Sequence, residues 1–136
     1  MDFPTELGIL TCLMILAVSL WIPFIVGTGS DPGAVDGFGR PHDPTTLKPW
    51  VARANRAHLN LLEQAMPFAV LVLIIDRLDG FTALTYWTAI AFFWLRIAHA
   101  IGMISGIAKM PVRPLIFTAG WICCLIMAYS VFAARF

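Results

Sequence analysis

Four long apolar stretches decide what this chain can fold into. They run over about residues 7–26, 54–75, 81–104 and 115–134. About twenty apolar residues in a helix cross the roughly 30 Å hydrocarbon core of a bilayer. The sequence therefore predicts an all-α integral membrane protein, a four-transmembrane-helix bundle with up-down topology that contacts membrane lipid.

The composition agrees with this fold class and excludes one class of partner. The 136 residues are 60% hydrophobic and 12% charged, whereas roughly a quarter of the residues in an ordinary soluble domain are charged. The formal net charge is +1 and no run of Lys or Arg occurs, so nothing would attract a nucleic-acid backbone. We expect residues 1–136 to form a single four-helix transmembrane domain without repeats.

The first apolar stretch is typical of a retained span. Residues 1–6 contain no Lys or Arg, and the apolar run after them is longer than that of a cleaved signal peptide. Pro23 is expected to kink or end this helix near the membrane boundary, where Trp21 would serve as an interfacial anchor.

A long polar loop, residues 27–53, follows the first span and is rich in Gly, Pro and Asp. Its length suits a lid over the next helix or a plain linker, and both interpretations stay open. His42 and Asp43 lie in this loop, but such a pair is more typical of solvated side chains, so we predict no metal site. The three cysteines, which lack metal-ligand spacing, are Cys12, Cys123 and Cys124.

A polar stripe enters the second apolar stretch from this loop. Arg56, Asn60 and Glu63 stand at i, i+4 and i+7, which places them on one helix face about two turns deep. A carboxylate at that depth in a bilayer is costly unless it is paired or hydrogen-bonded. Glu63 is therefore a functional-site candidate by default.

A second polar stripe lies in the third stretch, where Arg96 and His99 share a helix face. The charged turn at residues 76–80 is short, so the second and third helices are expected to be antiparallel neighbours. At about 1.5 Å per residue the two stripes reach comparable depths. This predicts contacts of Glu63 with Arg96 and of Asn60 with His99.

Two interpretations of these stripes stay open. Glu63 and Arg96 could simply neutralise each other and fasten the bundle, with Asn60 hydrogen-bonded between helices. Alternatively, an acid, an amide, an imidazole and guanidiniums at one mouth suit a small zwitterionic or anionic ligand. Arg113, which two prolines bracket at the first turn of the fourth helix, would stand at the rim of that mouth.

The distribution of Lys and Arg predicts the orientation. The positive-inside rule assigns the side with more of these residues to the cytoplasm. Both termini are therefore expected on the non-cytoplasmic side. The residues on the cytoplasmic side would be Arg40, Lys48, Arg53, Lys109 and Arg113, against Arg77 and Arg135 on the other.

Several motifs together carry a resemblance to a known family. They are Arg56-Ala57-His58 with Asn60 and Glu63, then Pro67-Phe68, Arg96-Ile97-Ala98-His99 and Pro-x-Arg-Pro at 111–114. With its length, four spans and long first loop, the chain resembles the superfamily of membrane-associated proteins in eicosanoid and glutathione metabolism (MAPEG) over nearly its whole length.

The resemblance implies a homotrimer that binds glutathione between neighbouring subunits near the cytoplasmic face. Glu63 would take the amino group of glutathione. Arg113 would be the arginine that stabilises the thiolate in catalytic members, because a free thiol, with a pKa of about 8.5, needs a cationic neighbour to ionise at neutral pH. The other residues that would hold or line the ligand are Arg56, Asn60, Arg96 and His99.

The chain departs from members of that family at four positions, which are Leu59, Met103, Pro114 and Phe117. Several catalytic members carry a tyrosine where this chain has Met103, and an aromatic hydroxyl where it has Phe117. The resemblance therefore implies a membrane glutathione transferase or peroxidase acting on lipophilic electrophiles, with a non-catalytic lipid-binding or scaffold subunit as the alternative. The sequence disfavours a transporter, since it shows no repeats, and a histidine-rich oxidase, since it has only three histidines.

Overall fold

The structure of the chain, a computed structural model, describes residues 2–29 and 48–136, and that part contains helices and no strand. Residues 30–47, with His42, Asp43 and most of the expected loop, lie outside the described residues. The helices are α1 (Thr5–Ser19), α2 (Trp21–Gly29), α3 (Pro49–Arg77), α4 (Ala83–Ser105) and α5 (Val112–Arg135).

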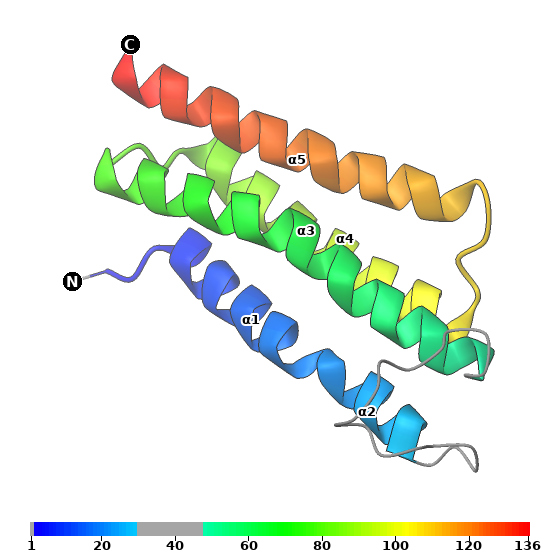
Figure 1. Cartoon of the computed structure of the whole chain (residues 1–136). Coiled ribbons are helices and arrows are strands. Elements are labelled where there is room, and N and C mark those ends of the chain that lie inside the picture. Colours follow the sequence, from blue (N-terminus) through cyan, green and yellow to red (C-terminus); the bar gives the residue numbers. More distant parts are fainter. Residues whose placement is uncertain (1, 30–47) are drawn as a thin grey trace.

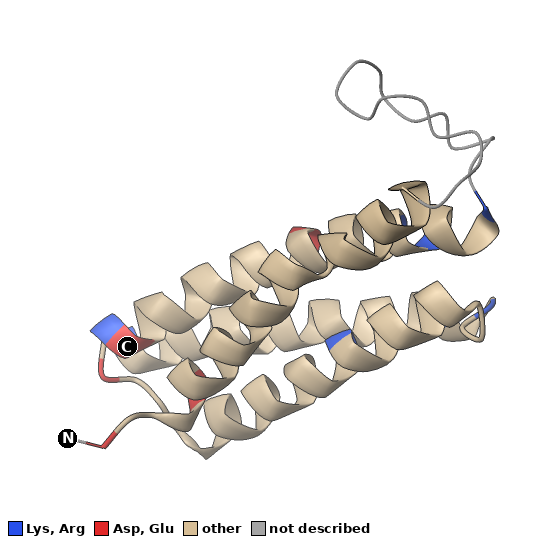
Figure 2. Cartoon of the chain, turned by 90° about the horizontal axis from the view of Figure 1, so that it is seen from below, with Lys and Arg blue, Asp and Glu red and all other residues tan. Residues whose placement is uncertain are grey.

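Four segments are long and apolar enough to cross a membrane. The continuous stretch of α1 and α2 has 25 residues, α3 has 29, α4 has 23 and α5 has 24. Charged residues gather at the two ends of the bundle and are sparse along its middle (Figure 2), as the cost of charge in lipid requires. These features confirm the predicted all-α transmembrane bundle.

The boundaries differ from the expected ones at both sides of the long loop. α2 continues to Gly29, and α3 begins at Pro49, where the fixed φ of proline suits a first helical turn. The predicted loop 27–53 is thus shorter at both ends, and Arg53 belongs to α3 rather than to the loop.

The first span is interrupted at Leu20, three residues before Pro23. Pro23 has no N–H to donate to the carbonyl of Ser19, and its ring crowds that carbonyl. α1 accordingly ends at Ser19 and the helix resumes at Trp21. Pro23 therefore breaks the helix one turn before itself rather than ending the span.

α3 and α4 form the centre of the bundle (Figure 1). α1 and α5 each pack on both of them, and no contact joins α1 to α5 within the described residues. Both termini lie at the end of the bundle that holds the turn between α3 and α4 (Figure 1). Successive spans therefore run in opposite directions.

One stripe of α3 faces the interior of this bundle. Its buried residues recur every three or four positions, as expected for one face of a helix. The ring of Phe68 stacks on that of Phe92 of α4, with centroids 4.0 Å apart. The apolar members of the stripe are Val51, Ala54, Ala57, Leu61, Ala65, Phe68, Val72 and Ile75.

Gln64 interrupts this apolar stripe and joins three helices. Its Nε2 donates to the carbonyl of Phe117 in α5 at 2.8 Å, and its Oε1 accepts from Nη1 of Arg96 in α4 at 3.0 Å. Gly120 leaves room for the amide, because a Cβ at that position would collide with it. Arg96 is only 1% exposed, so the Gln64 amide supplies the hydrogen-bond partner that a buried guanidinium needs.

We expect Gln64→Ala to lower the free energy of unfolding by about 3 kcal/mol, because it leaves Nη1 of Arg96 and the Phe117 carbonyl buried without partners. Gln64→Glu keeps an acceptor for Arg96 but loses the donor to Phe117, and should fall between Gln64→Ala and the wild type. Unfolding of the detergent-solubilised protein measures the effect.

Thr11→Ala is the control for this prediction. Thr11 is exposed, and its hydroxyl bonds only to the Leu7 carbonyl of its own helix at 2.8 Å, so its loss should change the unfolding temperature little. If Gln64→Ala unfolds at the same temperature as the wild type, the hydrogen bonds of Gln64 do not hold the bundle together.

Candidate functional site

A cavity of about 290 Å³ lies between α3, α4 and α5. Four of the residues proposed from the sequence line it together, namely Asn60 and Glu63 of α3, His99 of α4 and Arg113 of α5. The other lining residues come from the first turns of α5 and are Pro114, Phe117 and Thr118. An acid, an amide, an imidazole and a guanidinium thus converge on one hollow.

The turn between α4 and α5 brings Arg113 to this cavity. α4 ends at Gly106, which adopts the left-handed conformation (φ 79°) that glycine tolerates best. Arg53 of α3 donates from Nε and Nη2 to the carbonyl of Ile104, at 3.3 and 3.2 Å. This contact ties the end of α4 to the first turns of α3.

Arg96 does not line the cavity, and its expected contact with Glu63 is wrong within the described chain. The guanidinium bonds to Gln64 instead, and Glu63 is exposed. Adjacent helical residues point about 100° apart, so when Gln64 faces the interior, Glu63 faces the edge of the bundle. Nε of Arg96 remains buried without a hydrogen-bond partner.

Arg96 also determines the chemistry of His99. Its Nη2 lies 3.5 Å from Nδ1 of His99. A guanidinium has donors and no acceptor, so Nδ1 must present its lone pair to it. We therefore assign the proton of the neutral imidazole to Nε2, the other ring nitrogen. His99 is 1% exposed and lines the cavity, so it can act there as a neutral N–H donor.

Asn60 and His99 line the same cavity, as predicted, but no hydrogen bond joins them in the described part of the chain. Oδ1 of Asn60 is buried and has no hydrogen-bond partner, while the Nδ1 edge of His99 faces Arg96. An unpaired buried carbonyl oxygen is costly. Because Asn60 lines the cavity, a ligand with an N–H or O–H group could satisfy this oxygen.

Arg56 is exposed and lies outside the cavity. It shares the outer surface of α3 with Leu59, which is 50% exposed, and Met66, which is 69% exposed. This exposed surface also includes Glu63. We call these four residues the outer face of α3.

Three residues near the site were missed by sequence reasoning. Gln64 stands on the buried stripe of α3, three residues after Leu61, and its polarity at that position was the available indication. Thr118 brings a hydroxyl to the cavity next to Phe117, but nothing in the sequence pairs it with α3 or α4. Arg53 was assigned to a loop because the start of α3 was placed too late.

Met103 and Phe117, the two departures from the tyrosines of catalytic relatives, have different positions. Met103 is 1% exposed and belongs to the apolar core rather than to the cavity. Phe117 does line the cavity. Among the described residues, no group of three or more His, Cys, Asp or Glu side chains is arranged to hold a metal ion.

Comparison with known proteins identifies the family. No curated protein matches the chain. A sequence model of the MAPEG family matches residues 8–133, which is nearly the whole chain. Together with the four membrane-spanning segments, this match shows that the chain belongs to the MAPEG family.

Proposed function

We propose that the chain is an integral membrane glutathione-binding protein, a glutathione transferase or peroxidase that acts on lipophilic electrophiles. One observation carries the proposal: Asn60, Glu63, His99 and Arg113 line a single cavity in a chain of the MAPEG family. Glutathione would be a co-substrate, and the electrophile would reach the cavity from the surrounding lipid.

The lining groups complement the functional groups of glutathione. Glu63 suits the amino group, and the unpaired Oδ1 of Asn60 suits a peptide N–H. Arg113 is the cation that would stabilise the thiolate, which then attacks the electrophile. His99 would donate from Nε2, with Arg96 and Gln64 behind it to hold the ring in place.

In this proposal, hydrogen-bond donors other than tyrosine stabilise the thiolate sulfur of glutathione. Phe117 and Met103 carry no hydroxyl, but Thr118 and His99 line the same cavity. A hydroxyl or N–H that points at a thiolate stabilises the ionised form in a water-poor site. The lack of tyrosine at both positions is thus compatible with chemistry at the cavity.

The outer face of α3 supports a homotrimer. Arg56 and Glu63 are exposed there, and α3 is long enough to span the membrane. Charged side chains that face hydrocarbon are costly, and in membrane proteins they almost always face other protein or water. Neighbouring copies would cover this face, so that glutathione binds at the boundary between subunits and Arg56 contributes to its binding.

The proposed orientation places both termini on the non-cytoplasmic side. Both lie at the end of the bundle opposite to the turn that leads to Arg113 (Figure 1). Lys48, Arg53, Lys109 and Arg113 belong to the other end, which the positive-inside rule assigns to the cytoplasm. The proposed glutathione cavity would then open toward the compartment that supplies the tripeptide.

The alternative is a non-catalytic lipid-binding or scaffold subunit on the same bundle. The apolar groups at Met103 and Phe117 favour it, since several catalytic relatives carry aromatic hydroxyls at these positions. In that case the cavity would bind a ligand without activating a thiol, and substitution of Arg113 would leave the measured turnover unchanged.

Arg113→Ala is expected to lower kcat for a generic electrophile about 100-fold, because it removes the cation beside the developing thiolate. Arg135→Gln removes an exposed arginine at the other end of α5 and should leave kcat unchanged. Steady-state kinetics of the detergent-solubilised protein measures both. Equal turnover of Arg113→Ala and the wild type would favour the scaffold alternative.

Glu63→Gln is expected to raise the Kd for glutathione about tenfold, since it removes the charged partner of the amino group. Asp76→Asn, near the other end of α3, is the matched control and should bind as the wild type does. Titration calorimetry gives the Kd of each variant for glutathione, and the mass of the assembly is measured on the same samples. Weakened assembly with an unchanged Kd would refute the binding role of Glu63.

His99→Phe is expected to lower kcat more than His99→Gln does. Glutamine can accept from Arg96 and still donate an N–H into the cavity, whereas phenylalanine can do neither. The comparison is made at saturating glutathione, with kcat normalised to the folded fraction. Equal kcat values for the two variants would exclude a donor role for His99.

A further inference from the structure

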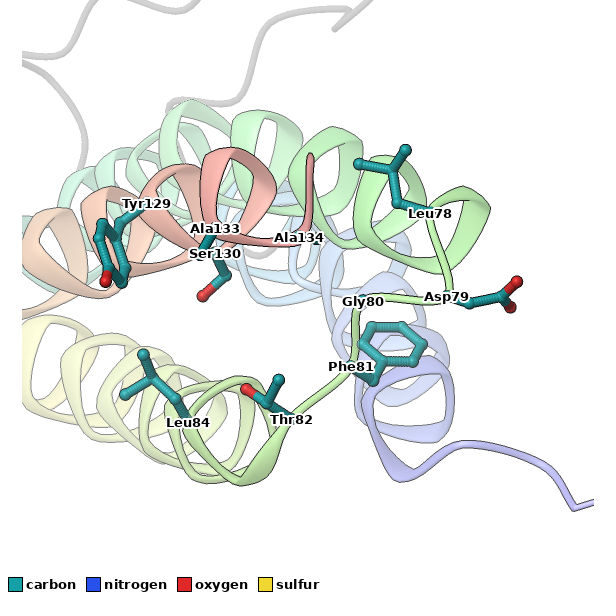
Figure 3. Close-up of a pocket in the computed structure, with 10 residues that line it drawn as sticks. All are labelled: Leu78, Asp79, Gly80, Phe81, Thr82, Leu84, Tyr129, Ser130, Ala133 and Ala134. Carbon is teal, nitrogen blue, oxygen red and sulfur yellow. The ribbon is translucent and has the colours of Figure 1, made fainter. Parts of the chain in front are cut away.

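A second cavity, of about 360 Å³ and shown in Figure 3, is lined by residues at the other end of the bundle from the glutathione cavity. It is bounded by the turn that joins α3 to α4 and by the last turns of α5. Both chain termini lie at this end as well (Figure 1). The cavity therefore stands where the spans leave the hydrocarbon core and the lipid headgroups begin.

Three hydroxyls from two helices face this cavity (Figure 3). They belong to Thr82, at the start of α4, and to Tyr129 and Ser130 of α5. Ser130 is 5% exposed and donates to the Ile126 carbonyl at 2.9 Å, which leaves its oxygen as an acceptor. Oγ1 of Thr82 accepts from the backbone N–H of Thr85 at 3.4 Å, which leaves its own hydrogen to donate.

Charges of both signs stand at the rim. Asp79 borders the cavity, and its carboxylate is directed outward, away from the hydroxyls (Figure 3). Arg77 and Arg135 are exposed and adjoin Leu78 and Ala134, which both line the cavity. The Thr82 and Tyr129 donors in the cavity and a carboxylate farther out suit a ligand with an inner anionic group and an outer cationic one.

The remaining walls are apolar and open to the bilayer. Leu84 of α4 and Tyr129 of α5 line the cavity and are 45% and 65% exposed. Trp87, one turn beyond Leu84 toward the membrane centre, is 65% exposed. α4 and α5 pack directly against each other, so acyl chains could lie along their shared outer surface.

We infer that this cavity binds the headgroup of a phospholipid with a primary ammonium, of the phosphatidylethanolamine class. The phosphate accepts from the hydroxyls of Thr82 and Tyr129, and the ammonium donates to Asp79. A choline headgroup has no N–H to donate to Asp79, and a glycerol headgroup has no cation for it. The site is independent of the glutathione cavity.

Binding is tested by native mass spectrometry of the full-length protein in detergent, titrated with phosphatidylethanolamine, phosphatidylcholine or phosphatidylglycerol of the same acyl chains. The wild type is expected to bind the ethanolamine lipid about tenfold more tightly than the other two. Asp79→Asn should abolish this preference. Asparagine suits the left-handed backbone at that position (φ 49°), so the turn should be kept.

Tyr129→Phe should weaken binding of all three lipids about fivefold, since each has the phosphate. Tyr86→Phe is the matched control, because Tyr86 is an exposed tyrosine near the start of α4 that lies outside the cavity. It should bind as the wild type does. Ala133→Phe, which fills the cavity from an exposed position, should abolish specific binding. Equal affinity of the wild type for the three lipids, or equal effects of Tyr129→Phe and Tyr86→Phe, would overturn the inference.

Discussion

A guanidinium buried among apolar helices is the constraint on which the rest of this bundle depends. Arg96 cannot stay charged in that interior without partners, and the structure supplies Gln64 and His99. Gln64 in turn holds the Phe117 carbonyl of α5. One charge thus links α3, α4 and α5, the helices that line the proposed glutathione cavity, and it also orients the imidazole of His99 in that cavity.

The bilayer imposes a second constraint on the outer face of α3. In water, an exposed Arg56 and Glu63 would need no explanation, but in a membrane-spanning helix they require other protein or water beside them. Gln64, which faces the interior, and Glu63, which faces outward, are neighbours in sequence but have different roles. Gln64 stabilises the fold of the chain, whereas Glu63 is exposed and lines the cavity.

Hydropathy alone predicted the four spans, and proline chemistry predicted a break near Pro23, because lipid and the missing N–H act locally. The spacing of Arg56, Asn60 and Glu63 correctly placed them on one side of α3. It could not say which side faces the interior, since a rotation of about 100° exchanges Glu63 for Gln64. The shared position of the Thr82 and Tyr129 hydroxyls could not be predicted from the sequence either. Only the antiparallel packing of α4 and α5 brings residues so distant in sequence to one cavity.

The central claim is that side chains from α3, α4 and α5 form one glutathione-binding cavity. A density map of the assembled protein in lipid nanodiscs with saturating glutathione tests this most directly. We predict tripeptide density against Asn60, Glu63, His99 and Arg113, at a boundary between subunits. An empty cavity at saturating glutathione, or these side chains sealed against a neighbouring subunit with no room for a ligand, would contradict the account.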